Sequence, residues 1–470
     1  MTARPFALAA LLAATLAAPA GADRLVFLNG DRIPGSLEGL EAGAQLLWQL
    51  PGQGSALRLP LASIHKLQFT ATDDPTAADH DLAVDLTNGD AVHGRLLELT
   101  PEAIEMESAA FGKLRVPRPM INGLNVTEGG YCLLANPGKG QDWSAERRGS
   151  WRVENGQMVA RDQGWICRAL LPADKPAPER IRIDFDCTTE ESGAGITLHF
   201  FCADEKNPTG DTNYTVQISG SYVFARKSVT TKEGGNGLFG VKRINRQNEQ
   251  LGEPQRIERS LGPGGTKVTL LADARAGLII LKLNGAKVKQ WVDPRGLGGK
   301  HGSAIGFTNN GQGTTTIRNL SVLVWSGLVE DAVPSPASRK DQVFLRNDDS
   351  FEGRVVSLAD HALTLQADHF GPIVVPTDRI LRVQLGSDST DQARRMAGDV
   401  RAAFRSGGQL TLQMRSLDKE GLSGFSENSG DARLALKSLR EIEFNLYAEK
   451  YPSPEVVTTG GLEALLEGGW

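Results

Sequence analysis

Short runs in which apolar and polar residues alternate cover most of the chain, and four of these runs share one pattern. An apolar run ends in a turn of the Asn-Gly-Asp type at Asn29–Asp31 and again at Asn88–Asp90. The turn recurs as Asn347–Asp349 and, in degenerate form, as Ser406–Gly408. Alternation with a period of two is typical of strands, and Asn-Gly turns join neighbouring strands into hairpins. The pattern therefore predicts an all-β protein.

The four copies, called repeats 1 to 4, are regularly spaced. Asn29 and Asn88 are 59 positions apart, and so are Asn347 and Ser406. Four or five short, strongly bent strands in each copy predict a small barrel or rolled sheet. We expect the repeats to cover residues 23–72, 81–126, 341–386 and 398–446. The equal spacing indicates that a two-barrel unit was duplicated as a pair.

Residues 127–326 lie between the two pairs of repeats, have a different sequence pattern and are predicted to form one domain. Strands that alternate strictly place Ile181, Ile183 and Phe185 in a core. Polar residues 230–254 are expected to form a long loop. The predicted connections and ends are a linker at 327–340, which is rich in Pro, Ser and Ala, and a tail at 447–470 without a packed pattern.

Each part of the chain resembles a known family. The Asn-Gly-Asp turn, the glycine four positions beyond its Asp and the closing Val116-Pro117 resemble Sm-like small barrels that accompany exported bacterial proteins. The central domain resembles the concanavalin-like jelly roll, and more closely its laminin-G-like and 3-keto-disaccharide hydrolase branches. This second resemblance is carried by Trp151–Gly156, Tyr214–Ile218, Leu281–Gly285 and Ile305–Phe307. It implies a sandwich, but that fold hosts lectins, hydrolases and inert spacers alike.

The first residues have the composition of a secretory signal. Arg4 precedes an apolar run at 6–18, and Ala20-Gly21-Ala22 supplies small residues for cleavage. We expect residues 1–22 to be a signal peptide and the mature chain to be exported, to the periplasm, the cell surface or beyond. The apolar run is short for a membrane span, so we expect no membrane span once the signal is removed.

Charge and cysteine content narrow the choice of partners. The net charge is -5 and no basic stripe is present, which argues against nucleic acid as a partner. All four cysteines lie in the central domain, and their spacing does not indicate a zinc site. Export would permit two disulfides, and buried free thiols are the alternative. The four are Cys132, Cys167, Cys187 and Cys202.

Candidate chemistry falls on outward-facing positions of the central domain. If three predicted strands are neighbours, Arg182, Asp184, His199 and Gln217 converge into a polar patch suited to sugar hydroxyls. Trp165 is the aromatic candidate for stacking on a sugar. An ordinary solvated face is the alternative to this patch.

Two further kinds of site depend on carboxylates. Asp184 or Asp186 with His199 could act as a catalytic acid and base, although adjacent carboxylates on a strand are common. Calcium is a candidate cofactor because loop oxygens cluster in the sequence, but they make no complete ligand set and no metal site is predicted. These loop residues are Asp204, Glu205 and Asp211.

These observations favour an exported, non-catalytic binding or scaffold protein that binds a glycan or an envelope protein through the concave face of the jelly roll. A carbohydrate-active hydrolase similar to the 3-keto-disaccharide hydrolase family is one alternative. A purely structural envelope component is another. The barrels are expected to set spacing or to allow self-association through open strand edges.

Overall fold

A computed structural model describes residues 22–448, with gaps at 42–43, 71–79, 127–131, 191–194, 210–211, 234–242, 258–260, 263–264, 298–300, 312, 326, 328–339, 347–348, 360, 368–369, 387–395 and 397. In these ranges the chain is built from strands, joined by loops and a few single-turn 3-10 helices, which confirms the predicted all-β fold. No helix in the described part of the chain is long and apolar enough to span a membrane. The predicted signal peptide and almost all of the predicted linker and tail lie outside the described residues.

Each repeat folds into five antiparallel strands, and the strands lie within the predicted ranges. Repeat 1 holds β1 (Asp23–Phe27), β2 (Arg32–Glu41), β3 (Gln45–Gln49), β4 (Leu57–Pro60) and β5 (Ile64–Gln68). Repeat 2 holds β6 (Leu82–Leu86), β7 (Ala91–Leu99), β8 (Ala103–Ser108), β9 (Gly112–Pro117) and β10 (Ile121–Val126). Repeat 3 holds β26 (Asp341–Leu345), β27 (Ser350–Ala359), β28 (Ala362–Ala367), β29 (Gly371–Pro376) and β30 (Ile380–Gln384). Repeat 4 holds β31 (Asp399–Phe404), β32 (Gln409–Leu417), β33 (Gly421–Ser426), β34 (Gly430–Ala435) and β35 (Leu439–Glu443).

The strand order within a repeat is the same in all four. In repeat 1, β1 pairs with β2 and β5, β2 pairs with β3, and β3 pairs with β4. A single-turn 3-10 helix joins the fourth and fifth strands of each repeat. These turns are η2 (Leu61–Ser63), η4 (Arg118–Met120), η6 (Thr377–Arg379) and η7 (Leu436–Ser438). The likeness to Sm-like barrels stays a prediction.

Close contact between the second and third strands explains the glycine pattern and its loss in repeat 4. A Cβ on Gly94 would come within 3.0 Å of the Glu107 carbonyl and would also touch Met106. In repeat 4 the large and small residues are exchanged, because Leu412 holds the glycine position and its side chain packs over Gly424. Repeat 4 is therefore a compensated copy of the pattern.

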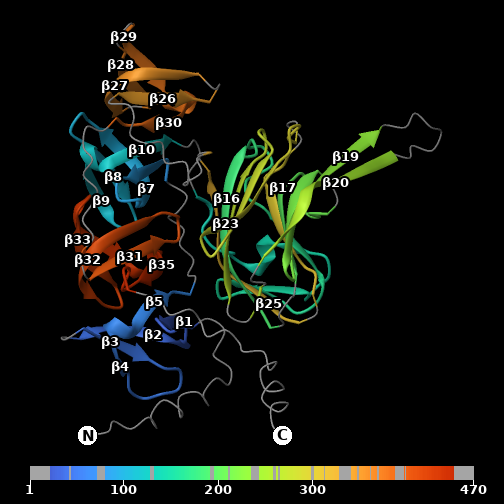
Figure 1. Cartoon of the computed structure of the whole chain (residues 1–470), viewed down its shortest axis with the longest axis horizontal. Helices are drawn as coiled ribbons and strands as arrows, with labels where there is room; N and C mark the ends of the chain where they lie inside the picture. Colours follow the sequence, from blue (N-terminus) through green and yellow to red (C-terminus); the bar gives the residue numbers. More distant parts are fainter. Residues whose placement is uncertain are drawn as a thin grey trace, which may run out of the picture.

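The four repeats stack into a single column whose order differs from their order in the sequence (Figure 1). The fifth strands of repeats 1 and 4 pair antiparallel, β5 with β35, and those of repeats 2 and 3 pair in the same way, β10 with β30. Repeats 2 and 4 meet in the middle, where Ala91 pairs with Gln409. The spatial order is therefore 1, 4, 2, 3, and one hydrophobic core cluster runs through all four repeats.

This arrangement changes the expectation about strand edges. The edges of the fifth strands are paired inside the chain, so they do not serve self-association. The fourth strands β4, β9, β29 and β34 have strand partners only in their own repeats among the described residues. Self-association through those edges stays a prediction.

The central domain is a sandwich of two antiparallel sheets. The first sheet has the order β13-β14-β25-β16-β21-β22-β23, with β11 paired to β25. Its strands are β11 (Cys132–Leu134), β13 (Trp151–Glu154), β14 (Gln157–Ala160), β16 (Arg180–Thr189), β21 (Thr266–Asp273), β22 (Leu278–Leu283), β23 (Ala286–Val292) and β25 (Thr315–Val324). The second sheet has the order β12-β15-β24-β17-β18-β19-β20. Its strands are β12 (Ser144–Ala145), β15 (Gly164–Ala169), β17 (Ile196–Cys202), β18 (Asn213–Ser219), β19 (Tyr222–Glu233), β20 (Arg243–Arg256) and β24 (Ala304–Asn309), and η5 (Gly140–Asp142) precedes β12.

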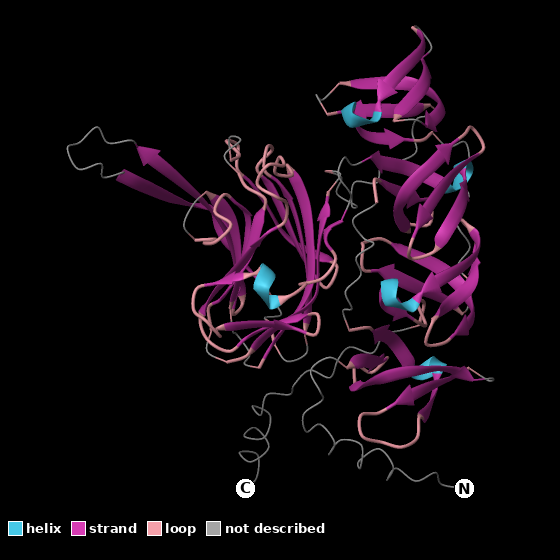
Figure 2. Cartoon of the chain, turned by 180° about the vertical axis from the view of Figure 1, so that it is seen from behind, coloured by secondary structure: helices cyan, strands magenta, loops and turns pink. Residues whose placement is uncertain are grey.

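A second hydrophobic core lies between the two sheets and contains Ile181, Ile183 and Phe185, as predicted from alternation. The expected loop at 230–254 is wrong for its described residues, because β19 and β20 form a long hairpin that extends away from the sandwich (Figure 2). Residues 247–250 of this hairpin are exposed. A strand that is exposed in this way needs no apolar alternation, so its sequence gave no strand signal.

The sandwich stands beside the column with its first sheet toward the repeats (Figures 1 and 2). Lys267 of β21 lies 4.0 Å from Glu441 of repeat 4. Leu323 of β25 packs over Gly407, in the first turn of repeat 4. The first sheet therefore has the hydrophobic core on one face and contacts the column with part of the other.

Candidate functional site

The predicted polar patch does not form, because its members belong to different sheets. Arg182 and Asp184 lie on β16, which pairs with β21 and β25 in the first sheet. His199 lies on β17 and Gln217 on β18, which pair with each other in the second sheet. Trp165 lies on β15 of the same second sheet. Since both groups point outward from a sandwich, the hydrophobic core separates them, and the predicted convergence is wrong.

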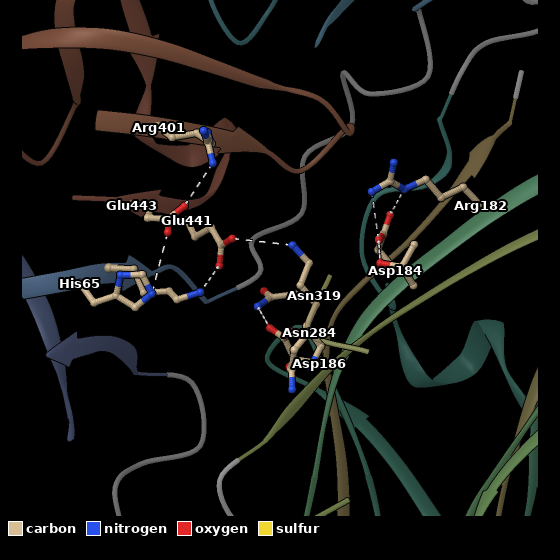
Figure 3. Close-up of polar contacts among 12 residues, drawn as sticks. His65, Arg182, Asp184, Asp186, Asn284, Asn319, Arg401, Glu441 and Glu443 are labelled. Carbon is tan, nitrogen blue, oxygen red and sulfur yellow. Dashed lines mark hydrogen bonds and ion pairs between the residues drawn. The ribbon is translucent and has the colours of Figure 1, made fainter. Parts of the chain in front are cut away.

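Arg182 and Asp184 form a structural ion pair at the junction with the column (Figure 3). The Arg182 Nε lies 2.6 Å from Asp184 Oδ2, and the Thr269 hydroxyl donates to Asp184 Oδ1 at 2.6 Å. Burial alone would raise the pKa of Asp184, which is 2% exposed, but the Arg182 guanidinium and the Thr269 hydroxyl lower that pKa to about 2. Asp184 is therefore held ionised, which suits a structural role better than that of a catalytic acid.

The arrangement expected for a hydrolase is also absent. Asp186 lies on the same face of β16 as Asp184 and accepts a hydrogen bond from the Asn319 amide at 2.7 Å. His199 is on the opposite sheet, and packed sheets are about 10 Å apart. An acid and base that share one proton path must lie within hydrogen-bond reach of the same substrate. Asp184, Asp186 and His199 cannot act in that way as a group.

Three of the predicted ligand-binding residues, Trp165, His199 and Gln217, do share the outer face of the second sheet. Cross-strand pairing puts Trp165 opposite Thr308, Thr308 opposite Thr197, and Thr197 opposite Gln217. Gln217 is in turn opposite Phe224 on β19. These five residues, called the polar row, cross five neighbouring strands on the outer face of the second sheet, with an aromatic ring at each end.

Hydrogen bonds fix the side chains in and beside the polar row. The His199 Nε2 lies 2.8 Å from the Thr308 hydroxyl, and the Asn310 amide donates to the Thr197 hydroxyl at 2.7 Å. The Arg226 guanidinium lies 4.9 Å from the centre of the Phe224 ring, within the range of a cation–π contact. The face thus offers hydroxyl, amide, imidazole and guanidinium groups together with aromatic surface.

Burial varies along this face in a way that matters for a ligand. Thr197 and His199 are buried, at 8% and 5% exposure, while Gln217 and Trp165 are half-buried. Tyr222, on the same strand as Phe224, is 51% exposed. Thr197, at the centre of the row, is therefore buried, while the side chains of Gln217 and Trp165 are partly accessible to a ligand.

Sequence reasoning missed Thr197 in this site, and it also missed Thr308 and Phe224. Both lie on strands that were recognisable by alternation, since Ile305 and Phe307 of β24 and Val223 and Ala225 of β19 are buried in the core. Their outward positions could have been read from that parity. Their place beside Gln217 and Trp165 depended on the strand order of the sheet, which alternation does not contain.

The candidate calcium ligands and the cysteines can be followed in the described part of the chain. Asp211 lies outside the described residues, and Asp204 accepts a hydrogen bond from the backbone of Lys206 at 2.8 Å. No group of three or more His, Cys, Asp or Glu residues suited to a metal ion occurs among the described residues. The four cysteines are free thiols, and Cys167, Cys187 and Cys202 are buried.

Comparisons with known proteins find solved structures of low sequence identity and low TM-score. No protein-family model matches the chain, and no curated protein matches its sequence. The carbohydrate-binding module CBM66 from Bacillus subtilis is 13% identical, covers 39% of this chain and 95% of its own, and has a TM-score of 0.26. A putative glycosyl hydrolase from Parabacteroides distasonis ATCC 8503 is 15% identical over 41% of this chain and 98% of its own, with a TM-score of 0.27. Sheep galectin-11 in complex with glycerol is 8% identical over 32% of this chain and 100% of its own, with a TM-score of 0.20. At these TM-scores the similarities carry no argument about function.

Proposed function

We propose that this chain is an exported, non-catalytic glycan-binding scaffold whose saccharide site is the outer face of the second sheet. The observation that carries the proposal is the polar row, in which Thr308, Thr197 and Gln217 lie between Trp165 and Phe224. Sugars present hydroxyl groups at their rims and C–H surfaces on their faces. Hydroxyl and amide side chains match the first, and aromatic rings match the second.

The position of the column supports this choice of face. Part of the outer face of the first sheet contacts the repeats, where Lys267 lies 4.0 Å from Glu441 of repeat 4. The second sheet faces away from the column (Figure 1). The column therefore leaves the outer face of the second sheet open to a ligand and covers the part of the first sheet that it contacts.

The chemistry of the row supports a binding role without catalysis. None of its five members is a carboxylate, and the carboxylates of β16 lie on the other sheet. The column then serves as a support, because its four repeats share one core and hold the sandwich by one face. The apolar run at 6–18 and the small residues that follow it support export of this scaffold.

The test is a glycan array probed with the mature chain, residues 23–470, followed by calorimetry with the best saccharide. The Gln217→Ala variant removes one amide of the row, and Gln290→Ala is its matched control on the first sheet, where Gln290 of β23 is exposed. One lost hydrogen bond costs about 0.5–1.5 kcal/mol, so we expect Gln217→Ala to weaken binding by roughly 2–13-fold. Trp165→Ala should weaken it further, and Gln290→Ala should bind like the wild type.

Two results would contradict the proposal. Binding that is unchanged in both Gln217→Ala and Trp165→Ala would place the saccharide elsewhere. Binding to no glycan at all would favour a purely structural envelope component. Thermal unfolding of each variant, measured alongside, separates a lost contact from a lost fold.

A further inference from the structure

A cavity lies where repeat 1 meets the first sheet of the sandwich. Its volume is about 130 Å³, several times the roughly 30 Å³ that one water molecule occupies in the liquid. Repeat 1 contributes Arg24 from β1 and Arg32 from β2 to its lining, and the sandwich contributes Arg318 from β25 and Asp186 from β16. The cavity is thus built by segments that are far apart in the sequence, and it is separate from the polar row on the other sheet.

Positive charge in this cavity exceeds negative charge. The three guanidinium groups of Arg24, Arg32 and Arg318 line it together with a single carboxylate, that of Asp186. Asp186 also accepts a hydrogen bond from the Asn319 amide at 2.7 Å. The Arg318 Nε donates to the neutral Gln157 side chain at 2.8 Å. In the described ranges, none of the three arginines has a carboxylate within 4.0 Å.

Two lysines at the edge of the cavity do not change this balance. Lys66 lies 3.6 Å and Lys267 4.0 Å from the same carboxylate, that of Glu441 in repeat 4. The carboxylate of Glu441, which Figure 3 labels, therefore pairs with both lysines. Five cations thus meet two carboxylates at this place.

The titration behaviour of the arginines agrees with an excess of positive charge. Burial and the neighbouring charges of Arg24 and Arg32 together lower the pKa of Arg318 to about 10, although the Asp186 carboxylate raises it. Burial and the charge of Arg32 likewise lower the pKa of Arg24. Burial also lowers the pKa of Arg32. An anion held among these groups would offset the repulsion and raise these pKa values.

We propose that this cavity binds a small oxyanion group, sulfate or phosphate, as the free ion or as an ester on a saccharide. Guanidinium groups present several N–H donors in a plane that matches the oxygens of such groups, and hydrogen bonds between opposite charges are the stronger kind. Amide and hydroxyl groups of Asn284, Thr188 and Thr266 line the same cavity and can satisfy further oxygens. Gly265, with a φ of +75°, has no side chain beside Arg32 and leaves that guanidinium open to the cavity.

The binding experiment uses the full mature chain and calorimetry with four probes: sodium phosphate, sodium sulfate, glucose 6-phosphate and glucose 6-sulfate, each at constant ionic strength set with sodium chloride. We expect saturable binding of at least one probe. The Arg32→Gln variant should weaken it at least tenfold. Its matched control is Arg58→Gln in the same repeat, whose exposed side chain pairs with Glu41 outside the cavity, and this control should bind like the wild type.

A second variant tests the sign of the argument. Asp186→Asn removes the carboxylate that competes with the anion, so it should tighten anion binding, whereas a merely disrupted cavity would weaken it.

Arg32→Gln, measured without anion, should melt at or above the wild-type temperature, because the substitution relieves repulsion among the arginines. A saccharide ester that binds at least tenfold more tightly than its inorganic ion identifies an esterified glycan as the ligand, and equal affinities identify the free ion.

The proposal is overturned if none of the four probes binds better than chloride, or if Arg32→Gln and Arg58→Gln bind alike. Neither result bears on the polar row, whose variants Gln217→Ala and Trp165→Ala change the other sheet. The two sites can therefore fail independently.

Discussion

Two phenylalanines at equivalent positions of repeats 2 and 3 give a sharp test of the column. Phe111 precedes β9 and is 9% exposed, and its ring centre lies 6.0 Å from that of Phe404 in repeat 4, at an angle of 65°. Phe370 precedes β29 in the same way but is 79% exposed. Repeat 2 lies between two neighbours, whereas repeat 3 ends the column (Figure 1). The same residue is therefore buried at one position and solvated at the other.

The expected cost of Phe111→Ala can be worked out from this geometry. Truncation of a buried Phe to Ala costs about 3–5 kcal/mol, and the edge-to-face ring pair accounts for roughly 0.5–1.5 kcal/mol of contact energy. Because Phe111 lies at an interface between repeats, we expect a loss of about 3 kcal/mol. Phe370→Ala removes an exposed ring and should change stability by no more than about 0.5 kcal/mol.

Hydrogen exchange at graded urea concentrations, read by mass spectrometry, measures the change separately for each repeat. Phe111→Ala should lower the unfolding free energy of peptides from β31–β35 as well as those from β6–β10, since one core joins both repeats. Phe370→Ala should leave both unchanged. Equal effects of the two variants, or an effect of Phe111→Ala that stops at repeat 2, would refute the 1, 4, 2, 3 order.

Three other predictions concern the junctions of the column. Burial lowers the pKa of His93 to about 3, so this imidazole stays neutral in the folded state while it takes up a proton near pH 6.5 in the unfolded state. The free energy of unfolding should therefore fall by at most about 1.4 kcal/mol per pH unit as the pH drops from 6.5 to 3. Melting curves of His93→Gln should lack this part of the pH dependence. Burial would raise the pKa of Glu441, but Lys66, Arg440 and Lys267 hold it at about 2, so its contribution is complete above pH 4.5 and is lost as the pH falls toward 2. Glu441→Gln should cost about 3 kcal/mol in urea unfolding at pH 7, and an unchanged midpoint would contradict the ion pairs. A Cβ on Gly407 would collide with Leu323 and His93, whereas one on the equivalent Gly89 meets nothing within 4 Å. Both glycines have a positive φ, so backbone strain is common to the two alanine variants. The free energy of unfolding of Gly407→Ala, measured by thermal melting, should therefore be lower than that of Gly89→Ala by about 1–3 kcal/mol, the cost of overpacking.

The strands and their buried faces could be predicted from the sequence, because both follow from local alternation. Ile181, Ile183 and Phe185 are in the core as expected, and Arg182 and Asp184 do point outward. Local alternation does not reveal which strand lies beside which. β16 and β17 are consecutive in the chain, yet β16 pairs with β25, so the patch predicted across them was divided between two sheets.

The order of the repeats in the column could not be predicted from the sequence, because alternation does not reveal which repeats are neighbours. The equal spacing of the repeats indicated two pairs, but the column joins repeat 1 to repeat 4 and repeat 2 to repeat 3 through their fifth strands. The repeats share the features that build one unit, whereas contacts between units, such as Phe111 with Phe404 and Gly407 with His93, do not follow from that shared pattern. The cationic cavity was missed because its arginines lie in segments that come together only in the folded chain.

The central claim is that the saccharide site lies on the second sheet and not on the first. Hydrogen exchange of the full mature chain, measured with and without a saturating saccharide selected on the array, tests it directly. The account predicts new protection in peptides of β17, β18 and β19, with peptides of β16 unchanged. Protection of β16 or of the repeats, with none on β17 to β19, would contradict it.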